Sequence, residues 1–312
     1  MDLSIIICTF NRAESLKVTL QSLAALRNKE RIDWEVIVVD NNSKDHSRNV
    51  VESFARANKA INVSYVFEKK QGKSHALNRG IECAGGDIIA FTDDDVTVDE
   101  RWLEEMWRAF DTFDGIGVGG RVVDEWSTEK PKWYVVEGAF RLNAVIVRYD
   151  LGEQSCEIED RTPPLGANMA FRRYAFQKYG GFDTRLGPSA KGLVRGEDSE
   201  FYLKLRRAGE RVMYLPNAVV FHPVEKRRTA KKYFRRWYID YGKAAITRNG
   251  APSSKRNLMG IPLYLYRDLA MNGLKRFVHI GGQKGFYYEL MFFQVWGSMM
   301  EIRNRGRLNA NR

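Results

Sequence analysis

Cysteine is scarce in this chain of 312 residues, and the three that occur, Cys8, Cys83 and Cys156, lie far apart. Their spacing fits neither a zinc site nor a redox pair, and so few thiols provide no disulfide framework, as is typical of a reducing compartment. The N-terminus lacks the basic start, long apolar core and cleavage site of a signal peptide. We therefore expect a cytoplasmic protein.

The sequence also lacks long apolar runs, and it has few acidic residues in its C-terminal region. No stretch of 18 uninterrupted apolar residues occurs, which argues against a membrane-spanning helix. Residues 223–312 hold 19 Lys plus Arg against 5 Asp plus Glu, a net charge of +14, whereas residues 1–222 carry −3. This asymmetry predicts an anionic partner for the C-terminal region, either a membrane surface or nucleic acid.

Short apolar runs alternate with helical patterns through the first hundred residues. The runs at 3–9, 34–40, 63–67 and 87–92 predict strands, and segments near 12–27, 44–58 and 73–84 predict helices. Such alternation indicates an α/β fold with a parallel sheet, whose ligands bind at the carboxyl ends of the strands. Thr9, Asp40 and the triplet Asp93, Asp94 and Asp95 all fall at such ends, so we expect them to converge.

The aspartate triplet is the densest negative cluster in the sequence. Mg²⁺ and Mn²⁺ take oxygen ligands, and magnesium commonly bridges one or two carboxylates to a substrate phosphate. Taken alone, an acidic triplet is more often a solvated turn before a helix, here the one that Asp99 and Glu100 would open. Its position at the converging strand ends favours the metal site.

Three further motifs each permit two interpretations. In Gly196–Glu200 the carboxylates either cap the helix predicted at 201–208 or provide a general base, Asp198. His222, at the end of the apolar run 219–221, is either a core histidine or a metal ligand. The segment 71–80 starts a helix with Gly72, Lys73 and Ser74, which either receive a phosphate or simply begin a surface helix; it is no Walker loop.

The glycines of Gly115–Gly120 match the dinucleotide-binding pattern, but we reject that assignment. The pattern requires a strand before it and a helix after it, whereas here a predicted helix, 102–110, precedes and a strand-like segment, 121–123, follows. Residues 124–165 are irregular and rich in Trp and Pro, and they predict an inserted substrate loop and hairpin.

Seven motifs together resemble glycosyltransferase family 2. They are Cys8–Arg12, Val39–Ser43, Lys73–Gly80, Thr92–Asp95, Gly166–Met169, Gly180–Asp183 and Gly196–Asp198. Each is weak alone, but their combination and order over residues 3–223 are specific. The resemblance implies a GT-A catalytic domain at 1–223, with a Rossmann-like nucleotide-sugar half at 1–110 and an acceptor half at 111–223. A basic, aromatic, helical extension would follow at 224–312.

The resemblance also implies site residues. The nucleotide-sugar donor would be bound by Thr9, Asn11, Arg12, Asp40, Lys73, Asn78, Asp93 and Asp94. Mn²⁺ or Mg²⁺ would be held by Asp95, Asp93 and His222, although three consecutive aspartates leave their division of labour open. Asn168 and Glu197 would face the donor sugar and acceptor, and Asp198 would be the catalytic base.

The implied reaction is a single displacement with inversion at the anomeric carbon. A sugar, with UDP as the favoured nucleotide, would pass to a hydroxyl of a glycan or lipid-linked acceptor in surface polysaccharide or glycoconjugate assembly. A sugar nucleotidyltransferase would share a metal and nucleotide site, but Thr9–Arg12 lacks its glycine-rich, basic loop. A non-catalytic nucleic-acid-binding protein would explain the basic region and leave the acidic clusters unexplained, so we expect no nucleic-acid partner.

Cations stand beside aromatic residues at 225–248, and 285–302 is strongly apolar apart from Glu289 and Gln294. These segments either lie in an anionic membrane surface, which would place the protein peripherally on the inner face of the membrane, or pack as a helical subdomain on the catalytic sheet. We favour the membrane surface, which also suits a lipid-linked acceptor.

Overall fold

The computed structural model describes residues 1–142, 145–158, 162–188 and 196–310, and the chain forms two compact units. The first unit contains Met1–Glu125, Val147–Thr184 and Glu197–Pro223. The second contains Trp126–Ile146, Arg185–Gly196 and Val224–Arg312. The second unit thus consists of the predicted C-terminal region and of two segments that come from within residues 1–223.

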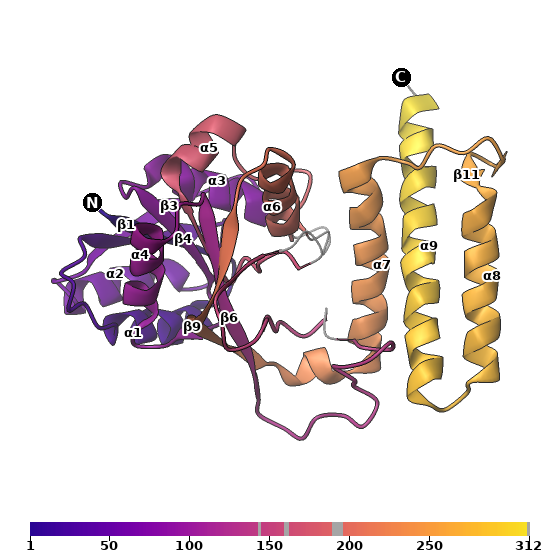
Figure 1. Ribbon diagram of the computed structural model, residues 1–312, viewed down its shortest axis with the longest axis horizontal. Coiled ribbons are helices and arrows are strands. Elements are labelled where there is room, and N and C mark those ends of the chain that lie inside the picture. Colours follow the sequence, from indigo (N-terminus) through magenta and orange to yellow (C-terminus); the bar gives the residue numbers. More distant parts are fainter. Residues whose placement is uncertain (143–144, 159–161, 189–195, 311–312) are drawn as a thin grey trace. The chain divides into compact units, whose positions relative to one another are not determined.

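The first unit begins with the predicted alternation of strands and helices (Figure 1). Its elements are β1 (Leu3–Thr9), α1 (Ala13–Ala24), β2 (Trp34–Asp40), α2 (Ser47–Ala57), β3 (Asn62–Phe67), α3 (Lys73–Cys83), β4 (Ile88–Asp93), β5 (Thr97–Val98), α4 (Trp102–Thr112), β6 (Gly117–Trp126), β7 (Cys156–Glu157), β8 (Asn168–Arg172), α5 (Arg173–Tyr179), α6 (Glu197–Arg207) and β9 (Val212–Val224).

The strands form one mixed sheet in the order β3-β2-β1-β4-β8-β6-β9-β5, with β7 also paired to β9. The first four strands are parallel, whereas β8 runs antiparallel to both β4 and β6. Parallel strands need crossover helices, which explains the alternation at the start of the chain, whereas β8 joins the sheet in the opposite direction. The carboxyl ends of β1, β2 and β4 therefore share one edge.

Helices cover both faces of the sheet. Ile5 and Ile7 of β1 pack with α1, α2 and α4 on one face, while Ile6 packs with α3, α5 and α6 on the other. Because successive side chains of a strand point to opposite faces, a strand buried on both sides must be apolar throughout. This requirement accounts for the uninterrupted run Ile5–Ile7, which is fully buried.

The glycines of Gly115–Gly120 lie in and before strand β6, with no helix directly after them, which agrees with our rejection of the dinucleotide-binding pattern. Gly117 and Gly120 pack tightly, since a Cβ on Gly117 would lie 2.3 Å from the Phe171 ring and one on Gly120 2.3 Å from the Ala218 oxygen. The hairpin predicted within 124–165 is wrong for the described residues. β7 pairs with β9, and Tyr149 forms an isolated bridge to Val122.

The second unit is built on helices. After the short 3₁₀ helix η1 (Lys226–Thr229), it contains α7 (Lys231–Asn249), a two-stranded ribbon, α8 (Leu263–Val278) and α9 (Gln283–Ala310); the ribbon is β10 (Asn257–Leu258) and β11 (Ile261–Pro262). Helix α9 packs against both α7 and α8 (Figure 1). Gly242 and Gly297 lie where α7 and α9 meet, because a Cβ on either would come within 2.0 Å of a carbonyl oxygen of the other helix.

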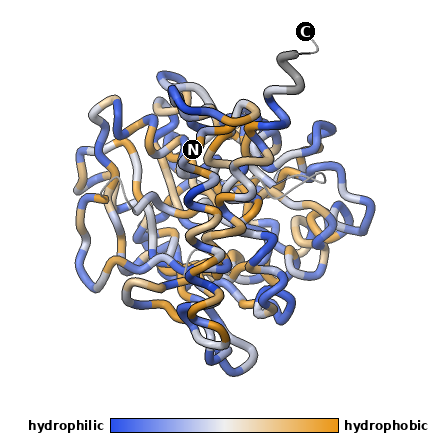
Figure 2. The backbone as a smooth tube through the Cα atoms, turned by 90° about the vertical axis from the view of Figure 1, so that its right-hand side faces the viewer, coloured by the Kyte–Doolittle hydropathy of each residue, from blue (hydrophilic) through white to orange (hydrophobic). Residues whose placement is uncertain are grey.

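Hydrophobic and hydrophilic residues alternate along the backbone in Figure 2, including its helices. Among the described residues, no helix combines the length and the apolar character needed to cross a bilayer.

Candidate functional site

The parallel register brings three strand ends together, two of which are acidic. Thr9 is the Cα partner of Asp40 across β1 and β2, and Cys8 is the partner of Asp93 across β1 and β4. The backbone N–H of Asn41 donates to the Thr9 carbonyl oxygen at 2.9 Å, which extends the pairing past the strand ends. The edge predicted to hold the ligand is therefore lined by Thr9, Asp40 and Asp93.

Among the described residues, one group of side chains could hold a metal ion. It consists of Asp93, Asp95 and His222. One ligand atom from each lies within 4.8 Å of the others. β5 pairs antiparallel with β9, with Thr97 opposite Phe221, and this pairing brings His222 to the aspartates that precede β5. The nearest atoms of His222 and Asp95, Nε2 and Oδ1, are 3.5 Å apart.

The geometry of His222 fits a metal ligand. Its ring is 2% exposed, and Nδ1 lies 3.1 Å from the Pro223 carbonyl oxygen. Because a carbonyl oxygen only accepts, Nδ1 carries the hydrogen of the neutral ring, which leaves a lone pair on Nε2 beside Asp95. Metal-binding histidines commonly donate their second ring N–H to a backbone carbonyl in this way. Two carboxylates and one imidazole suit Mn²⁺.

Two basic side chains compensate the aspartate triplet. Arg12 Nη1 lies 3.1 Å from Asp94 Oδ1 and 2.5 Å from Asp95 Oδ2, and Lys73 Nζ lies 2.5 Å from Asp93 Oδ1. Burial alone would raise the pKa of Asp93, but the Lys73 ammonium lowers it to about 2.

Asp94 differs from its neighbours. Burial raises its pKa to about 7, and the negative charges of Asp95 and Asp93 act in the same direction against the opposing Arg12. Asp93 is thus a charged carboxylate at neutral pH, whereas Asp94 titrates near neutrality. The pair Asp93 and Asp95, rather than Asp94, shares the group with His222.

Asp40 is held by a hydrogen-bond network at the same edge. Its carboxylate accepts from the Tyr65 hydroxyl at 2.7 Å and from the Ser43 backbone N–H at 2.8 Å. Asn11 adopts a positive φ of 52°, and its Oδ1 accepts from the Lys44 backbone N–H at 2.7 Å. Asn11 and Asp40 therefore fix the loop 41–44 beside the strand ends.

The start of α3 is shaped by Gly72. Its φ of 139° is one that residues with a side chain rarely adopt, and its N–H donates to Asn41 Oδ1 at 2.7 Å. Lys73 is thereby directed at Asp93. Burial opposes the charge of Lys73, but Asp93 and Glu197 raise its pKa above the ordinary value, so it is a permanent cation.

Asp198 lies in the first turn of α6, close to Lys73. Its Oδ2 accepts from the Gly166 N–H at 3.0 Å, and its Oδ1 accepts from the Ser199 N–H at 2.7 Å. A Cβ on Gly166 would lie 3.5 Å from Asp198 Oδ2 and 3.7 Å from Lys73 Nζ, so both side chains reach this glycine. The Glu197 side chain is buried. Lys73, which pairs with Asp93 of the metal-binding group, and Asp198 thus both lie beside Gly166.

Residues 4–180 match the family model described as glycosyl transferase family 2, which covers more than half of the chain. The chain belongs to this family. It is a glycosyltransferase with the GT-A fold, as the sequence motifs predicted. The match favours this function over the two alternatives, a sugar nucleotidyltransferase and a nucleic-acid-binding protein.

Two curated relatives match most of this glycosyltransferase. One is the glucosyl-dolichyl phosphate glucuronosyltransferase of Haloferax volcanii, 29% identical over 252 residues, which are 79% of this chain and 77% of the relative. The other is the succinoglycan biosynthesis protein ExoM of Rhizobium meliloti, 32% identical over 235 residues, which are 73% and 71% of the two chains.

Solved glycosyltransferases share the fold at low identity. The mannosyltransferase PcManGT from Pyrobaculum calidifontis, in complex with GDP-Man and Mn²⁺, aligns with a TM-score of 0.63 and 17% identity over 97% of this chain and 87% of that one. S. aureus TarS 1–349, in complex with UDP-GlcNAc, aligns with a TM-score of 0.56 and 14% identity over 99% and 92%.

Two asparagines of the glycosyltransferase motifs have their amides engaged within the protein. Asn168 is fully buried; its Oδ1 accepts from the Trp102 indole at 2.8 Å, and its Nδ2 donates to the Arg121 and Ala218 carbonyls, each at 2.8 Å. Asn78 exchanges two hydrogen bonds with the backbone of Phe182. In this structure both bind neighbouring strands and loops together, so their contact with donor or acceptor stays a prediction.

Sequence reasoning did not single out Tyr65 or Asn41 as site residues. Tyr65 anchors Asp40, and Asn41 joins the β2 end to the loop before α3, since its Nδ2 donates to the Lys70 carbonyl at 2.7 Å. Asn41 stands within the motif Val39–Ser43, so its position offered a signal. Tyr65 lies in β3 two residues before the strand end, with Val38 of β2 as its Cα partner. Only the pairing of β3 with β2 brings its hydroxyl to Asp40.

Proposed function

We propose that this glycosyltransferase moves a sugar from a UDP-sugar to a hydroxyl of a glycan or lipid-linked acceptor, with inversion and with a divalent metal ion, in surface polysaccharide or glycoconjugate assembly. The observation that carries the proposal is the grouping of Asp93, Asp95 and His222 at the strand edge that also holds Asp40, with Asp198 close by. A diphosphate needs positive charge, and a displacement at a sugar carbon needs a base.

The residues fit the metal that the proposal requires. Asp93, Asp95 and His222 would hold Mn²⁺ or Mg²⁺, and the bound ion would supply Lewis-acid stabilisation of the departing diphosphate. Arg12 and Lys73 lie beside these ligands and bring fixed positive charge to the same place. Both cations would attract the diphosphate oxygens and orient the donor's anomeric carbon toward the acceptor.

Asp198 is the general base of the proposed displacement. Its carboxylate would take the proton from the acceptor hydroxyl as the oxygen attacks the anomeric carbon and the bond to the diphosphate breaks. The hydrogen bonds from Gly166 and Ser199 fix its position at the start of α6. No covalent intermediate is required, so one carboxylate suffices.

Donor and acceptor classes draw further support from the relatives. Their names include a glucosyl-dolichyl phosphate acceptor and succinoglycan synthesis, which are lipid-linked and polysaccharide chemistries. The nucleotide base would lie near Thr9 and Asp40. UDP is the expected nucleotide, and GDP is the principal competitor because the aligned complexes contain UDP-GlcNAc and GDP-Man.

Thermal-shift measurements test the proposal directly. Folded protein would be screened against UDP, GDP and dTDP sugars, each with and without Mn²⁺. A rise in melting temperature that requires both a UDP-sugar and the metal is expected. A shift with GDP-sugars alone would mean that the donor carries GDP instead of UDP. A shift that does not need Mn²⁺ would contradict the proposed metal site. No shift with any donor would contradict the proposed donor-binding site.

A further inference from the structure

Helix α8 and the turn that follows it expose large apolar side chains. Leu274, Phe277, Val278 and Ile280 are 60, 71, 67 and 73% exposed, and every residue from Leu274 to Lys284 is classed as exposed. Single exposed apolar residues are common on protein surfaces, but four within seven positions form a cluster. Residues 274–280 thus form an apolar tip at the end of α8.

The apolar tip continues along one side of α8. Met271, Leu274 and Val278 follow the i, i+3, i+7 spacing of one helix face, and Met271 is 46% exposed. The opposite side already packs inward, because Leu265 is buried in a cluster with Ile302 of α9, and Leu269 packs against that cluster. Helix α8 thus carries a second apolar face that its own unit does not cover.

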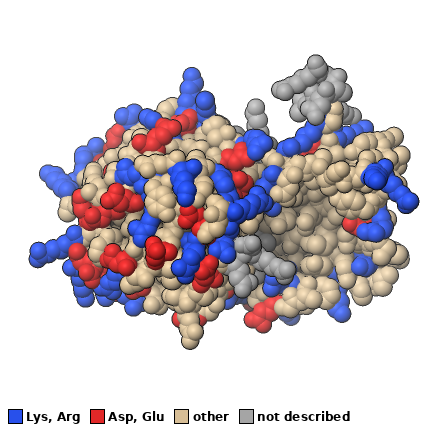
Figure 3. Space-filling view, turned by 45° about the horizontal axis from the view of Figure 1, so that its top comes forward, with Lys and Arg blue, Asp and Glu red and all other residues tan. Residues whose placement is uncertain are grey.

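Positive charge surrounds the apolar tip. Residues 269–288 contain no Asp or Glu, yet they include Lys275, Arg276 and Lys284, all exposed. Arg276 pairs with Glu289 at 3.0 Å, which leaves Lys275 and Lys284 of these three as the cations for an anionic partner. Lys275 Nζ lies 5.3 Å from the Tyr288 ring centroid, and Lys284 Nζ lies 5.4 Å from that of Phe140. This pattern differs from the wider surface, where Figure 3 shows basic and acidic side chains interspersed over much of the visible face.

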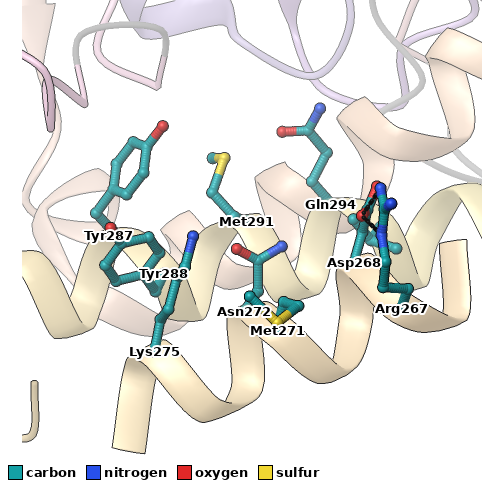
Figure 4. Close-up of a pocket in the computed structure, with 10 residues that line it drawn as sticks. Arg267, Asp268, Met271, Asn272, Lys275, Tyr287, Tyr288, Met291 and Gln294 are labelled. Atoms are coloured by element: carbon teal, nitrogen blue, oxygen red, sulfur yellow. Dashed lines mark hydrogen bonds and ion pairs between the residues drawn. The ribbon is translucent and has the colours of Figure 1, made fainter. Parts of the chain in front are cut away.

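A groove between α8 and α9 extends the same surface. It has a volume of about 560 Å³, and Met271 and Lys275 of α8 face Tyr287, Tyr288 and Met291 of α9 across it (Figure 4). Tyrosine and lysine, which combine apolar bodies with polar ends, are suited to a boundary between water and hydrocarbon. Met271 belongs to both the groove and the exposed face of α8.

We propose that the apolar tip of α8, together with Lys275 and Lys284, docks on an anionic lipid surface. The apolar side chains would enter the boundary between headgroups and acyl chains, and the cations would contact lipid phosphates. A second copy of the chain is a poorer occupant, because a symmetric contact would bring the same cations together. An anionic bilayer meets both the apolar and the charge requirement.

This surface is not the one that the sequence indicated. Phe234, Trp237 and Tyr238 of α7 are 1, 7 and 5% exposed and belong to the core of the second unit, as do Phe286 and Leu290 of α9. Their pattern of aromatics beside cations reflects packing between helices. The lipid-binding assignment therefore moves from 225–248 and 285–302 to the α8–α9 turn.

Vesicle flotation with the full chain tests the docking surface. Wild-type protein is expected to float with phosphatidylglycerol–phosphatidylcholine vesicles at low salt and less with phosphatidylcholine alone. Val278→Asp and Phe277→Asp should each weaken binding about tenfold or more, because each replaces an apolar side chain that would enter the bilayer with a charged one. The matched control is Val18→Asp, since Val18 is 50% exposed on α1 of the first unit.

A second pair of variants separates charge from apolar contact. Lys275→Gln with Lys284→Gln should reduce binding to anionic vesicles and flatten its salt dependence, whereas Lys17→Gln with Lys29→Gln should not. Circular dichroism verifies that each variant is folded. Wild-type protein that ignores anionic vesicles, or Val278→Asp protein that binds them normally, overturns the proposal. So does a wild-type dimer that Val278→Asp dissociates, which would assign the surface to a second copy.

Discussion

At the residue scale, the carboxylate of Asp198 is the group whose removal should separate chemistry from binding. Asp198→Asn keeps an oxygen that can accept the Gly166 N–H bond, so the loop should stay in place, but an amide cannot take a proton. We expect kcat to fall by about 10²–10⁴-fold. The Kd for the donor, measured by calorimetric titration, should stay within about twofold of the wild-type value. Asp111→Asn, on the exposed side of α4, is the control, and near-normal turnover of Asp198→Asn would remove the assignment.

Asp95 should report on the metal rather than on proton transfer. Asp95→Asn keeps the volume of the side chain but removes a charged ligand from the group of three. The Mn²⁺ concentration needed for half-maximal donor binding should rise at least about tenfold, because a carboxylate is a better ligand for a hard cation than an amide. Asp99→Asn, four residues on, should leave this concentration unchanged, and an unaltered metal dependence of Asp95→Asn would contradict the site.

The sequence correctly indicated where candidate site residues lie when their position at the end of a predicted strand also determines their position in the sheet. Thr9, Asp40 and Asp93 end parallel strands, and parallel register alone brings them together. Asn168 and Asn78 were assigned to the ligands because they stand in motifs. Their hydrogen bonds run to Ala218 and Phe182, 50 and 104 positions away, and no local pattern predicts such partners.

At the element scale, the crossing of α7 and α9 depends on two glycines. A Cβ on Gly242 would lie 2.0 Å from the Gln294 carbonyl oxygen, which belongs to the rigid backbone of α9. Gly242→Ala should therefore lower the free energy of unfolding by about 1–3 kcal/mol, measured by urea denaturation.

Gly273→Ala is the matched control for this change. Its Cβ would find the Phe292 ring at 3.7 Å, an ordinary contact, and alanine is the better helix former by about 0.5–1 kcal/mol. The two substitutions should thus have opposite signs. Equal effects would mean that helix propensity, rather than close packing of α7 on α9, decides the outcome.

Glu289 connects the three helices of the second unit. Its carboxylate lies 2.6 Å from Arg235 Nε of α7 and 3.0 Å from Arg276 Nε of α8. Burial alone would raise the pKa of Glu289, but these two bonds lower it below the ordinary value of 4.5.

A lowered pKa gives a stability contribution that is complete above pH 4.5 and is lost as the pH falls below it through the folded value. Glu289→Gln should therefore cost stability at pH 7 and cost less near pH 3. Urea midpoints at several pH values measure this, with the exposed Glu82→Gln as control. A penalty that does not change with pH would show that the carboxylate charge is irrelevant.

The positions of helices and strands were predictable where the hydrophobic pattern is strong and neighbouring elements in the sequence are also neighbours in the sheet. The strands predicted at 3–9 and 34–40 agree with β1 and β2, because both are buried on two faces and must be apolar throughout. The segment 124–165 was harder, since β7 has two residues and pairs with the distant β9. Proline and tryptophan there indicated irregular structure without revealing which strand it would join.

At the scale of the whole molecule, each compact unit has hydrophobic clusters of its own, and all the proposed site residues lie in the first. We expect two calorimetric unfolding transitions. Donor with Mn²⁺ at about 100 times Kd should stabilise one of them by about 2.7 kcal/mol, because only the folded first unit binds. Gly242→Ala should lower the other. Equal displacement of both transitions by either treatment would contradict this division.

The pairing of Arg12 with Asp94 and Asp95, and of Lys73 with Asp93, has a consequence for how the catalytic unit matures. These two side chains act as built-in counterions, so a cluster of three carboxylates can be enclosed during folding without an inorganic ion to neutralise it. If the proposed metal ion binds here, it would exchange with a tethered cation instead of creating the local structure. The enzyme would in this way be assembled first and loaded afterwards, whatever the supply of the metal at the moment of synthesis.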